Sequence, residues 1–122
     1  ATTFRFQMGT LNGDPWSLGD GLTFTLQNAA ASALGLGGGG LGYQGIAKSV
    51  AVKFDAVNNA GEGVNSTGFY TDGAAPTVAA TDLSASNLDL RSGHVFRVDA
   101  NYDGTRLTVT IADETTGQSA TQ

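Results

Sequence analysis

Apolar and polar residues alternate along several stretches of this chain, and the alternation limits its possible folds more than any other feature. In each stretch every second side chain is apolar and most of the intervening ones are polar. The apolar members are Phe4, Phe6 and Met8; Leu22, Phe24 and Leu26; Val50, Val52 and Phe54; Phe96, Val98, Ala100 and Tyr102; and Leu107, Val109 and Ile111. A period of two is typical of β-strands with one buried face. The pattern predicts an all-β chain folded as an antiparallel β-sandwich.

The connections between these stretches fall into tight turns and long loops. Tyr102-Asp103-Gly104-Thr105 joins the last two stretches, and Asp-Gly is expected to supply the positive φ angles of a hairpin turn. The cluster at residues 11–15 predicts a second turn. Residues 28–46 and 72–92 are predicted to be long loops, and the alanines at the start of the first could form one helical turn. Long irregular segments in a small domain are usually functional or disordered.

Composition narrows the class of protein. A chain of 122 residues is long enough for one core, so we expect a single domain over residues 1–122. It has no cysteine, and its 11 acidic against 6 basic residues give a net charge of −5, which argues against nucleic-acid binding. No apolar run approaches the roughly 18 residues of a membrane span, so membrane insertion is not expected. Abundant glycine with few lysines and glutamates favours a secreted, extracellular β-domain.

Four segments, in order, resemble parts of the L-type (legume-type) lectin domain. They are GDGLTFTL at 19–26, GGGLGY at 38–43, VAVKFDAVNNAGE at 50–62 and YDGTRLTVTI at 102–111. The resemblance is strongest to the secreted bacterial branch of that family. It implies a concanavalin A-like jelly roll, shorter than the usual family domain and without its opening and closing strands. It also implies a saccharide as the ligand.

The resemblance assigns three positions to the sugar. Asp20 would accept hydrogen bonds from two adjacent hydroxyls, Gly39 or Gly40 would donate a backbone N–H, and Asn59 would donate its side-chain amide. The chemistry is sound on physical grounds, because a carboxylate, an amide and an N–H together satisfy neighbouring hydroxyls. Glycine lets the backbone approach a ligand closely. The alternatives are a turn aspartate for Asp20 and a flexible surface loop for the glycines.

A calcium site is implied beside the sugar. Its oxygen ligands would be Asp55, the carbonyl of Val57, Asn59 and Glu62. Calcium accepts six to eight oxygens in irregular geometry, with waters completing the shell. The family carries aspartate at the position of Glu62, so the longer glutamate is expected to distort the site.

No transition metal is expected next to the calcium. The family holds that metal with an acid where this chain has Lys53 and a histidine where it has Ser66. Lys53 lies on the same side of its predicted strand as Asp55, so we expect its ammonium to replace part of the metal's charge. The alternative is that Lys53 pairs with a surface acid.

Weak binding is expected from the lack of a stacking ring. The family usually has an aromatic residue at the position of Val57, and aromatic faces supply much of the apolar contact with a sugar. Rings from other loops could take that role, with core packing as the alternative. The candidates are Trp16, Tyr43, Phe69 and Tyr70. Without such a ring, binding would depend on avidity.

An enzyme is not expected. The Gly-rich run at residues 35–40 fits a dinucleotide-binding motif by letter only, because no βαβ unit surrounds it. His94 is the only histidine and there is no cysteine, which leaves no material for a catalytic triad or a zinc site. A glycosidase on this type of sandwich needs paired carboxylates, often on one strand, and residues 53–57 contain no glutamate.

Two functions remain open at the level of the sequence. The first is carbohydrate binding, as a lectin or carbohydrate-binding module. The second is a structural or adhesive sandwich that has lost sugar binding. Its open sheet edges would then pair with another chain, as a homo-oligomer or by strand exchange.

Overall fold

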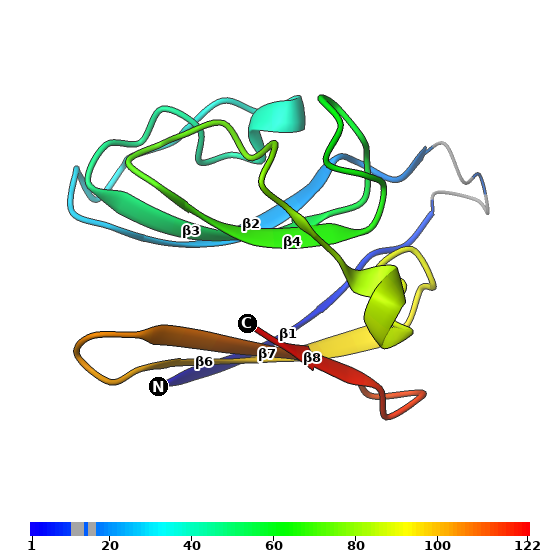
Figure 1. Ribbon diagram of the computed structural model, residues 1–122. Coiled ribbons are helices and arrows are strands. Elements are labelled where there is room, and N and C mark those ends of the chain that lie inside the picture. Colours follow the sequence, from blue (N-terminus) through cyan, green and yellow to red (C-terminus); the bar gives the residue numbers. More distant parts are fainter. Residues whose placement is uncertain (11–13, 15–16) are drawn as a thin grey trace.

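The computed structural model describes residues 1–10, 14 and 17–122 and contains two packed antiparallel sheets (Figure 1). The β6 sheet has the order β1-β6-β7-β8, and the β3 sheet has the order β2-β3-β4-β5. The strands are β1 (Thr2–Gln7), β2 (Gly21–Gln27), β3 (Ser49–Asp55), β4 (Ser66–Thr71), β5 (Thr81–Asp82), β6 (Val95–Tyr102), β7 (Leu107–Asp113) and β8 (Ser119–Thr121). Two short 3-10 turns are η3 (Gly38–Gly40) and η4 (Leu83–Ser86). In the described part of the chain, no helix has the length and apolar character to cross a membrane.

The core lies between the sheets and is built from the alternating residues. Val52 and Phe54 of β3 and Phe96 of β6 are fully buried. The ring of Phe6 lies 4.9 Å from that of Phe54 and 5.4 Å from that of Phe96. Each such ring is worth about 1.5–3 kcal/mol when buried. The predicted β-sandwich is therefore confirmed, with the predicted faces turned inward.

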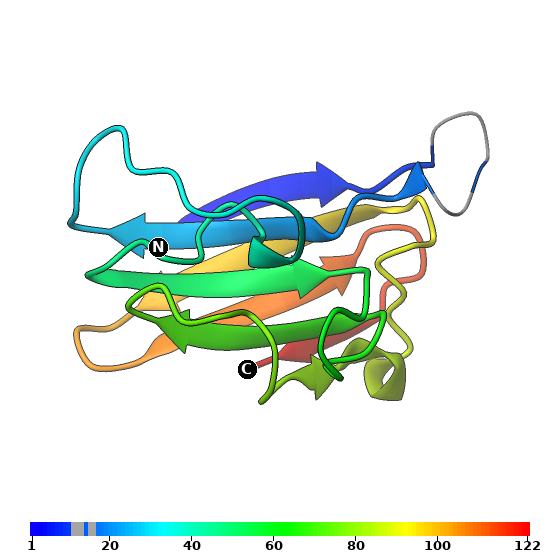
Figure 2. The ribbon, with the colours of Figure 1, turned by 90° about the horizontal axis from the view of Figure 1, so that it is seen from above.

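A smaller apolar cluster covers the outer face of the β3 sheet. Residues 28–48 fold over this face as an extra layer of loop, seen above β3 in Figure 1 and crossing the strands in Figure 2. The hydroxyl of Tyr43 donates to the carbonyl of Ala74, which ties this loop to residues 72–80. Tyr70 of β4 donates its hydroxyl to the carbonyls of Thr77 (2.6 Å) and Ala79 (2.8 Å). These contacts fix the Gly-rich loop against the sheet.

Two local expectations differ from the structure, one is confirmed and one lies mostly outside the described residues. A single hydrogen-bonded turn, from Ala33 N–H to the carbonyl of Ala30 at 3.0 Å, replaces the helical turn expected there. The 72–92 segment is not all loop, because it contains β5 and η4. The β6–β7 hairpin forms as predicted, but in its turn only Gly104 has a positive φ. Asp103 instead accepts the N–H groups of Thr105 and Arg106 at 2.8 Å each. The turn predicted at 11–15 lies mostly outside the described residues.

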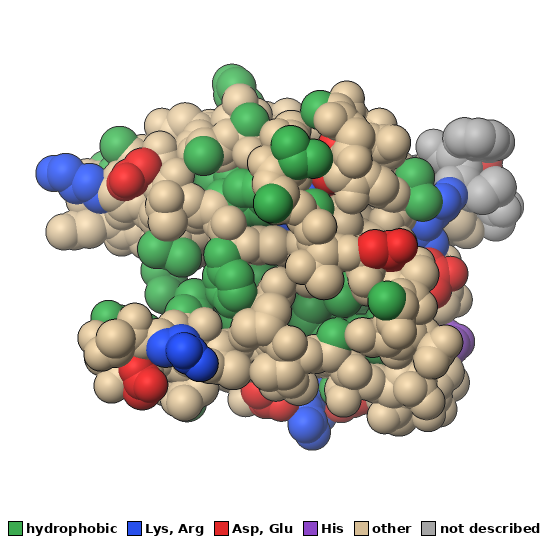
Figure 3. Space-filling model, in the orientation of Figure 1, with side chains coloured by type: hydrophobic (Ala, Val, Ile, Leu, Met, Phe, Trp, Pro, Cys, Tyr) green, Lys and Arg blue, Asp and Glu red, His purple; other side chains and the backbone are tan. Residues whose placement is uncertain are grey.

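One long side of the sandwich is incompletely covered. β5 pairs only with Ser66 and Thr67, and β8 has only three residues against the seven of β7. Two inner-face side chains beyond these short strands are exposed, Phe69 by 38% and Tyr102 by 59%. Leu26, on β2 at the opposite edge of the β3 sheet, is exposed by 49%. Figure 3 shows apolar side chains in the hollow between the two layers. The short edge strands thus leave apolar surface in contact with solvent.

Candidate functional site

Two loops meet at one end of the β3 sheet and bring Asp20 against Asn59. Asp20 precedes β2, and its carbonyl accepts the N–H of Ala56 at 2.8 Å. The next residue, Gly21, has a φ of +151°, and a Cβ there would lie 2.2 Å from the carbonyl oxygen of Phe54. Only glycine allows this close approach. Asn59, in the loop after β3, donates its side-chain Nδ2 to Oδ1 of Asp20 at 3.2 Å.

The 3-10 turn η3 lies against the pair formed by Asp20 and Asn59. A Cβ on Gly39 would lie 3.0 Å from Cγ of Asn59, and one on Gly38 would lie 3.4 Å from Oδ2 of Asp20. Gly40 is buried and faces Leu36 instead. Of the two glycines proposed from the sequence, the structure therefore brings Gly39 to Asp20 and Asn59, and not Gly40. The nearby Gly38, which has a φ of +56°, was not among the residues proposed from the sequence.

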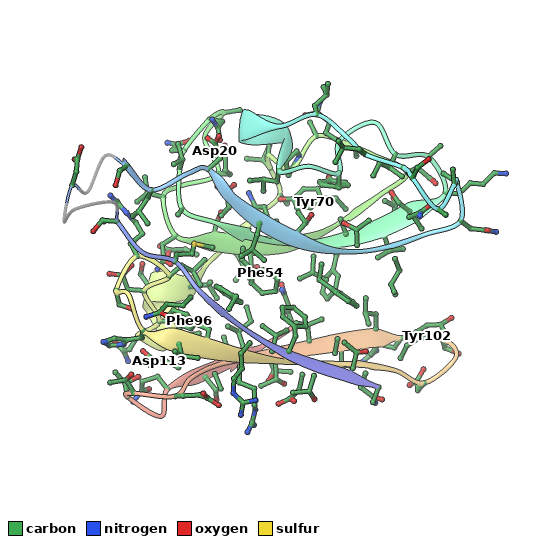
Figure 4. All side chains as sticks on the ribbon, turned by 180° about the vertical axis from the view of Figure 1, so that it is seen from behind. Asp20, Phe54, Tyr70, Phe96, Tyr102 and Asp113 are labelled. Carbon is green, nitrogen blue, oxygen red and sulfur yellow. The ribbon has the colours of Figure 1, made fainter. Side chains whose placement is uncertain are left out.

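Asp20 lies between two hollows at the end of the molecule opposite Tyr102 (Figure 4). The first has a volume of about 550 Å³ and is lined in part by Thr23, Gly38 and Gly42. The second has a volume of about 350 Å³ and is lined in part by Val57, Val64 and Arg91. Cavities of a few hundred Å³ are the usual size for small-molecule binding. The Asp20 carboxylate is thus accessible to a ligand from two sides.

Beneath the site, the ammonium of Lys53 is fully buried and surrounded by oxygen atoms. Its Nζ lies 2.9 Å from Oδ2 of Asp55 and 2.7 Å from the carbonyl of Pro76, and 5.6 Å from the centre of the Tyr70 ring. Burial raises the pKa of the Asp55 carboxyl, against the opposing effects of Lys53 and of the N–H of Val57. The predicted orientation of Lys53, on the same face as Asp55, is confirmed. The surface alternative is wrong, because Lys53 is not exposed.

Glu62 shapes the loop that carries Asn59. Its Oε1 accepts the N–H of Asn59 at 2.8 Å, and its Oε2 accepts the N–H of Ala60 at 2.6 Å. Burial raises the pKa of Glu62, but the hydrogen bonds from backbone N–H groups outweigh it, so the pKa lies below its usual value. An ionised carboxylate is the best acceptor for two N–H groups. Glu62 therefore holds Asn59 in place from within the loop.

Comparison with known proteins shows a similarity to a lectin-domain protein. The chain is 35% identical over 106 residues to the L-type lectin-domain containing receptor kinase VIII.1 of Arabidopsis thaliana. The chain is L-type lectin-like. The match covers 81% of this chain but only 14% of that relative. No family model matches.

Two of the predicted calcium ligands in this loop already accept hydrogen bonds from the protein. Asp55 binds Lys53 and the N–H of Val57, and Glu62 binds two loop N–H groups. Asn59 donates its amide Nδ2 to Asp20, which leaves its side-chain oxygen, the predicted ligand atom, out of that bond. Calcium needs six or more oxygens turned toward one point. Within residues 1–10, 14 and 17–122, no three His, Cys, Asp or Glu side chains come together, and the predicted site has only the two carboxylates of Asp55 and Glu62. Calcium binding stays a prediction, and this geometry opposes it.

The lectin-like site has an aliphatic wall in place of a stacking ring. Tyr43 and Tyr70 are buried in the cluster on the outer face of the β3 sheet, and Phe69 points into the gap between the sheets. None of these three can stack on a ligand at Asp20, and for them the alternative of core packing holds. Trp16 lies outside the described residues. Leu18, Val57 and Val64 line the hollow instead.

His94 has a structural partner away from this site. Its Nδ1 lies 2.8 Å from Oδ2 of the buried Asp113, at the end of β7. Burial raises the pKa of Asp113, but His94 and the N–H groups of Thr115 and Thr116 outweigh it and lower the pKa to about 2.

Proposed function

We propose that this lectin-like domain binds saccharides through Asp20, Gly39 and Asn59. The observation that carries the proposal is the contact between Asn59 Nδ2 and Asp20 Oδ1 beside the backbone of Gly39. A carboxylate acceptor next to an amide donor matches two neighbouring hydroxyls of a pyranose, each of which both donates and accepts. The relative's name, L-type lectin-domain containing receptor kinase, is consistent with this ligand class.

The proposal is of a binding domain and not of an enzyme, acting outside the cell. Aliphatic contacts from Leu18 and Val57 replace ring stacking, so each site binds weakly and function depends on several sites acting together. Placement in the secreted bacterial branch is part of the same proposal. Calcium, first expected as a helper, has its role in shaping the loop taken over by Lys53 and Glu62.

A glycan array with the purified domain tests the proposal. Multivalent display of the domain on beads compensates for weak single-site binding. We expect a defined set of glycans to bind, and Asp20→Ala to abolish that binding while the melting temperature stays unchanged. Glu114→Ala is the matched control, because it removes a carboxylate that pairs with Arg5 on the β6 sheet. Absence of binding to every glycan, or equal loss in both variants, would contradict the proposal.

A second function, a structural or adhesive domain, is favoured by the exposed inner-face residues. Phe69 of β4 is exposed by 38% beyond the end of the short strand β5. Open strand edges can pair with those of another molecule. On this account two copies associate along the β4 edge. Light scattering would show a stable dimer that Phe69→Ser converts to monomer. A monomer at all concentrations would rule it out.

A further inference from the structure

Arg91 carries a buried polar atom that has no partner. It lies in the connection between η4 and β6, and its Nε is inaccessible to solvent without a hydrogen-bond acceptor. No ion pair joins its guanidinium to any carboxylate among the described residues. A buried donor left without an acceptor costs about 1–3 kcal/mol, and more when it is charged. Such a group in a native structure calls for an explanation.

The polar side chains that line the same hollow do not bind the guanidinium of Arg91. Asp89 uses its Oδ1 to accept the backbone N–H of Arg91 at 2.9 Å, which positions the chain but leaves the guanidinium free. The amide of Asn65 binds Ser84, the carbonyl of Leu88 and the N–H of Leu90. The protein therefore holds Arg91 in place by its backbone and leaves the guanidinium without an acceptor.

Arg91 lies where two hollows adjoin. One is the 350 Å³ hollow that Asp20 and Val57 also line. The other has a volume of about 580 Å³ and extends toward Asn87. Leu18 and Val64 line both hollows together with Arg91. Asp20 and Arg91 thus line the same hollow, where one ligand can contact both side chains.

We propose that Arg91 binds the carboxylate of an acidic saccharide whose hydroxyls are held at Asp20. This inference rests on the proposed function and narrows it to uronic acids and other carboxylated sugars. The planar guanidinium matches a carboxylate through two parallel hydrogen bonds. Asp20, in the same hollow, accepts hydroxyls and does not pair with Arg91, so one ligand with both groups satisfies the two side chains.

Matched glycosides test this proposal directly. Methyl glucuronide and methyl glucoside differ only in a carboxylate against a hydroxymethyl group, and methyl galacturonide and methyl galactoside form a second pair. Affinities are measured by NMR titration for the wild-type domain, Arg91→Gln and Arg91→Lys. Arg106→Gln is the control, because it removes an equal charge from the exposed β6–β7 turn. Thermal melting checks that each variant is folded.

We expect the acidic member of at least one pair to bind about tenfold more tightly, as one charge-assisted contact allows. Arg91→Gln should remove this preference and leave the neutral sugar unaffected, Arg91→Lys should keep part of it, and Arg106→Gln should keep all of it. Equal affinity within each pair, with Asp20→Ala losing both sugars, would overturn this inference and leave the proposed function standing. An acidic preference that depends on Arg91 but survives Asp20→Ala would support Arg91 and contradict the Asp20 site. Failure of every uronide to bind would also overturn the inference.

Discussion

The side-chain amide of Asn59 lies 3.2 Å from the carboxylate of Asp20, although 39 residues separate them along the chain. Each residue lies in a loop next to a strand of the β3 sheet, and β2 pairs with β3 so that Gly21 lies opposite Asp55. This antiparallel register puts the start of β2 beside the end of β3. The sheet therefore places an acceptor and a donor side by side at the end of its strands, where hydroxyl groups can bind both.

The close fit of Gly39 against Asn59 predicts that Gly39→Ala weakens saccharide binding. The added Cβ would come within 3.0 Å of Asn59 Cγ and 3.1 Å of its Nδ2, so the amide must move. We expect a severalfold loss of affinity with little change in melting temperature, because the site is on the surface. Gly37→Ala is the control, since a Cβ there meets nothing within 4 Å. Equal effects of the two variants on glycan binding would contradict this role.

Lys53 is predicted to be essential for stability. Lys53→Met leaves the Asp55 carboxylate buried without its ammonium, and breaking a buried pair costs about 3–5 kcal/mol. Denaturant unfolding should show this loss, and the double variant Lys53→Met/Asp55→Asn should recover part of it. Lys48→Met, at an exposed position, should leave stability nearly unchanged. A Lys53→Met variant as stable as the wild type would show that the ammonium does not hold the loops.

Divalent ions are predicted to have no effect on the domain. The oxygens of Asp55 and Glu62 already accept hydrogen bonds from Lys53 and loop N–H groups, so a cation would have to displace them. Thermal melting and glycan binding should be the same in EDTA and in excess Ca²⁺. A ligand that binds only the folded state raises the melting temperature. A clear rise with Ca²⁺ that Glu62→Gln removes would restore the calcium site.

The hydrogen bonds between Asp113 and its neighbours His94, Thr115 and Thr116 lead us to predict a loss of stability in acid. The pKa of Asp113 is lowered from 3.8 to about 2 in the folded chain. A carboxyl with a lowered folded-state pKa stabilises the fold above its unfolded pKa, and this stabilisation disappears as the pH falls through the folded value. Asp113→Asn should therefore be less stable than the wild type near neutral pH. The difference should shrink as the pH falls from about 4 to about 2, measured by denaturant unfolding. A stability difference between wild type and Asp113→Asn that does not change with pH would contradict this role of the Asp113 carboxylate.

The sequence predicted the inward faces of the sandwich because alternation is set by burial on one side of a strand. It did not predict β4, since Thr67 and Thr71 occupy inner positions around Phe69 and blur the pattern. The strands β5 and β8 are too short to show a period at all. They form by pairing with longer neighbours, and this depends on the fold and not on local sequence.

The candidate site was partly predictable. Asp20, Gly39 and Asn59 were chosen by family resemblance, and the fold brings all three together. The face of the strand on which Lys53 lies was predicted from the period of two. Nothing in the sequence marked Arg91, because an unpaired guanidinium is recognisable only when its neighbours in space are known.

The central claim is that saccharide hydroxyls bind at the Asp20–Asn59 contact, and an NMR titration of the ¹⁵N-labelled domain tests it most directly. On adding a glycan that binds on the array, the account predicts early shifts of the Asn59 side-chain amide and of the backbone N–H groups of Gly38 and Gly39. Signals from the β6–β7 turn should stay in place. Shifts confined to Leu26, Phe69 and their neighbours, with Asn59 unmoved, would contradict the account.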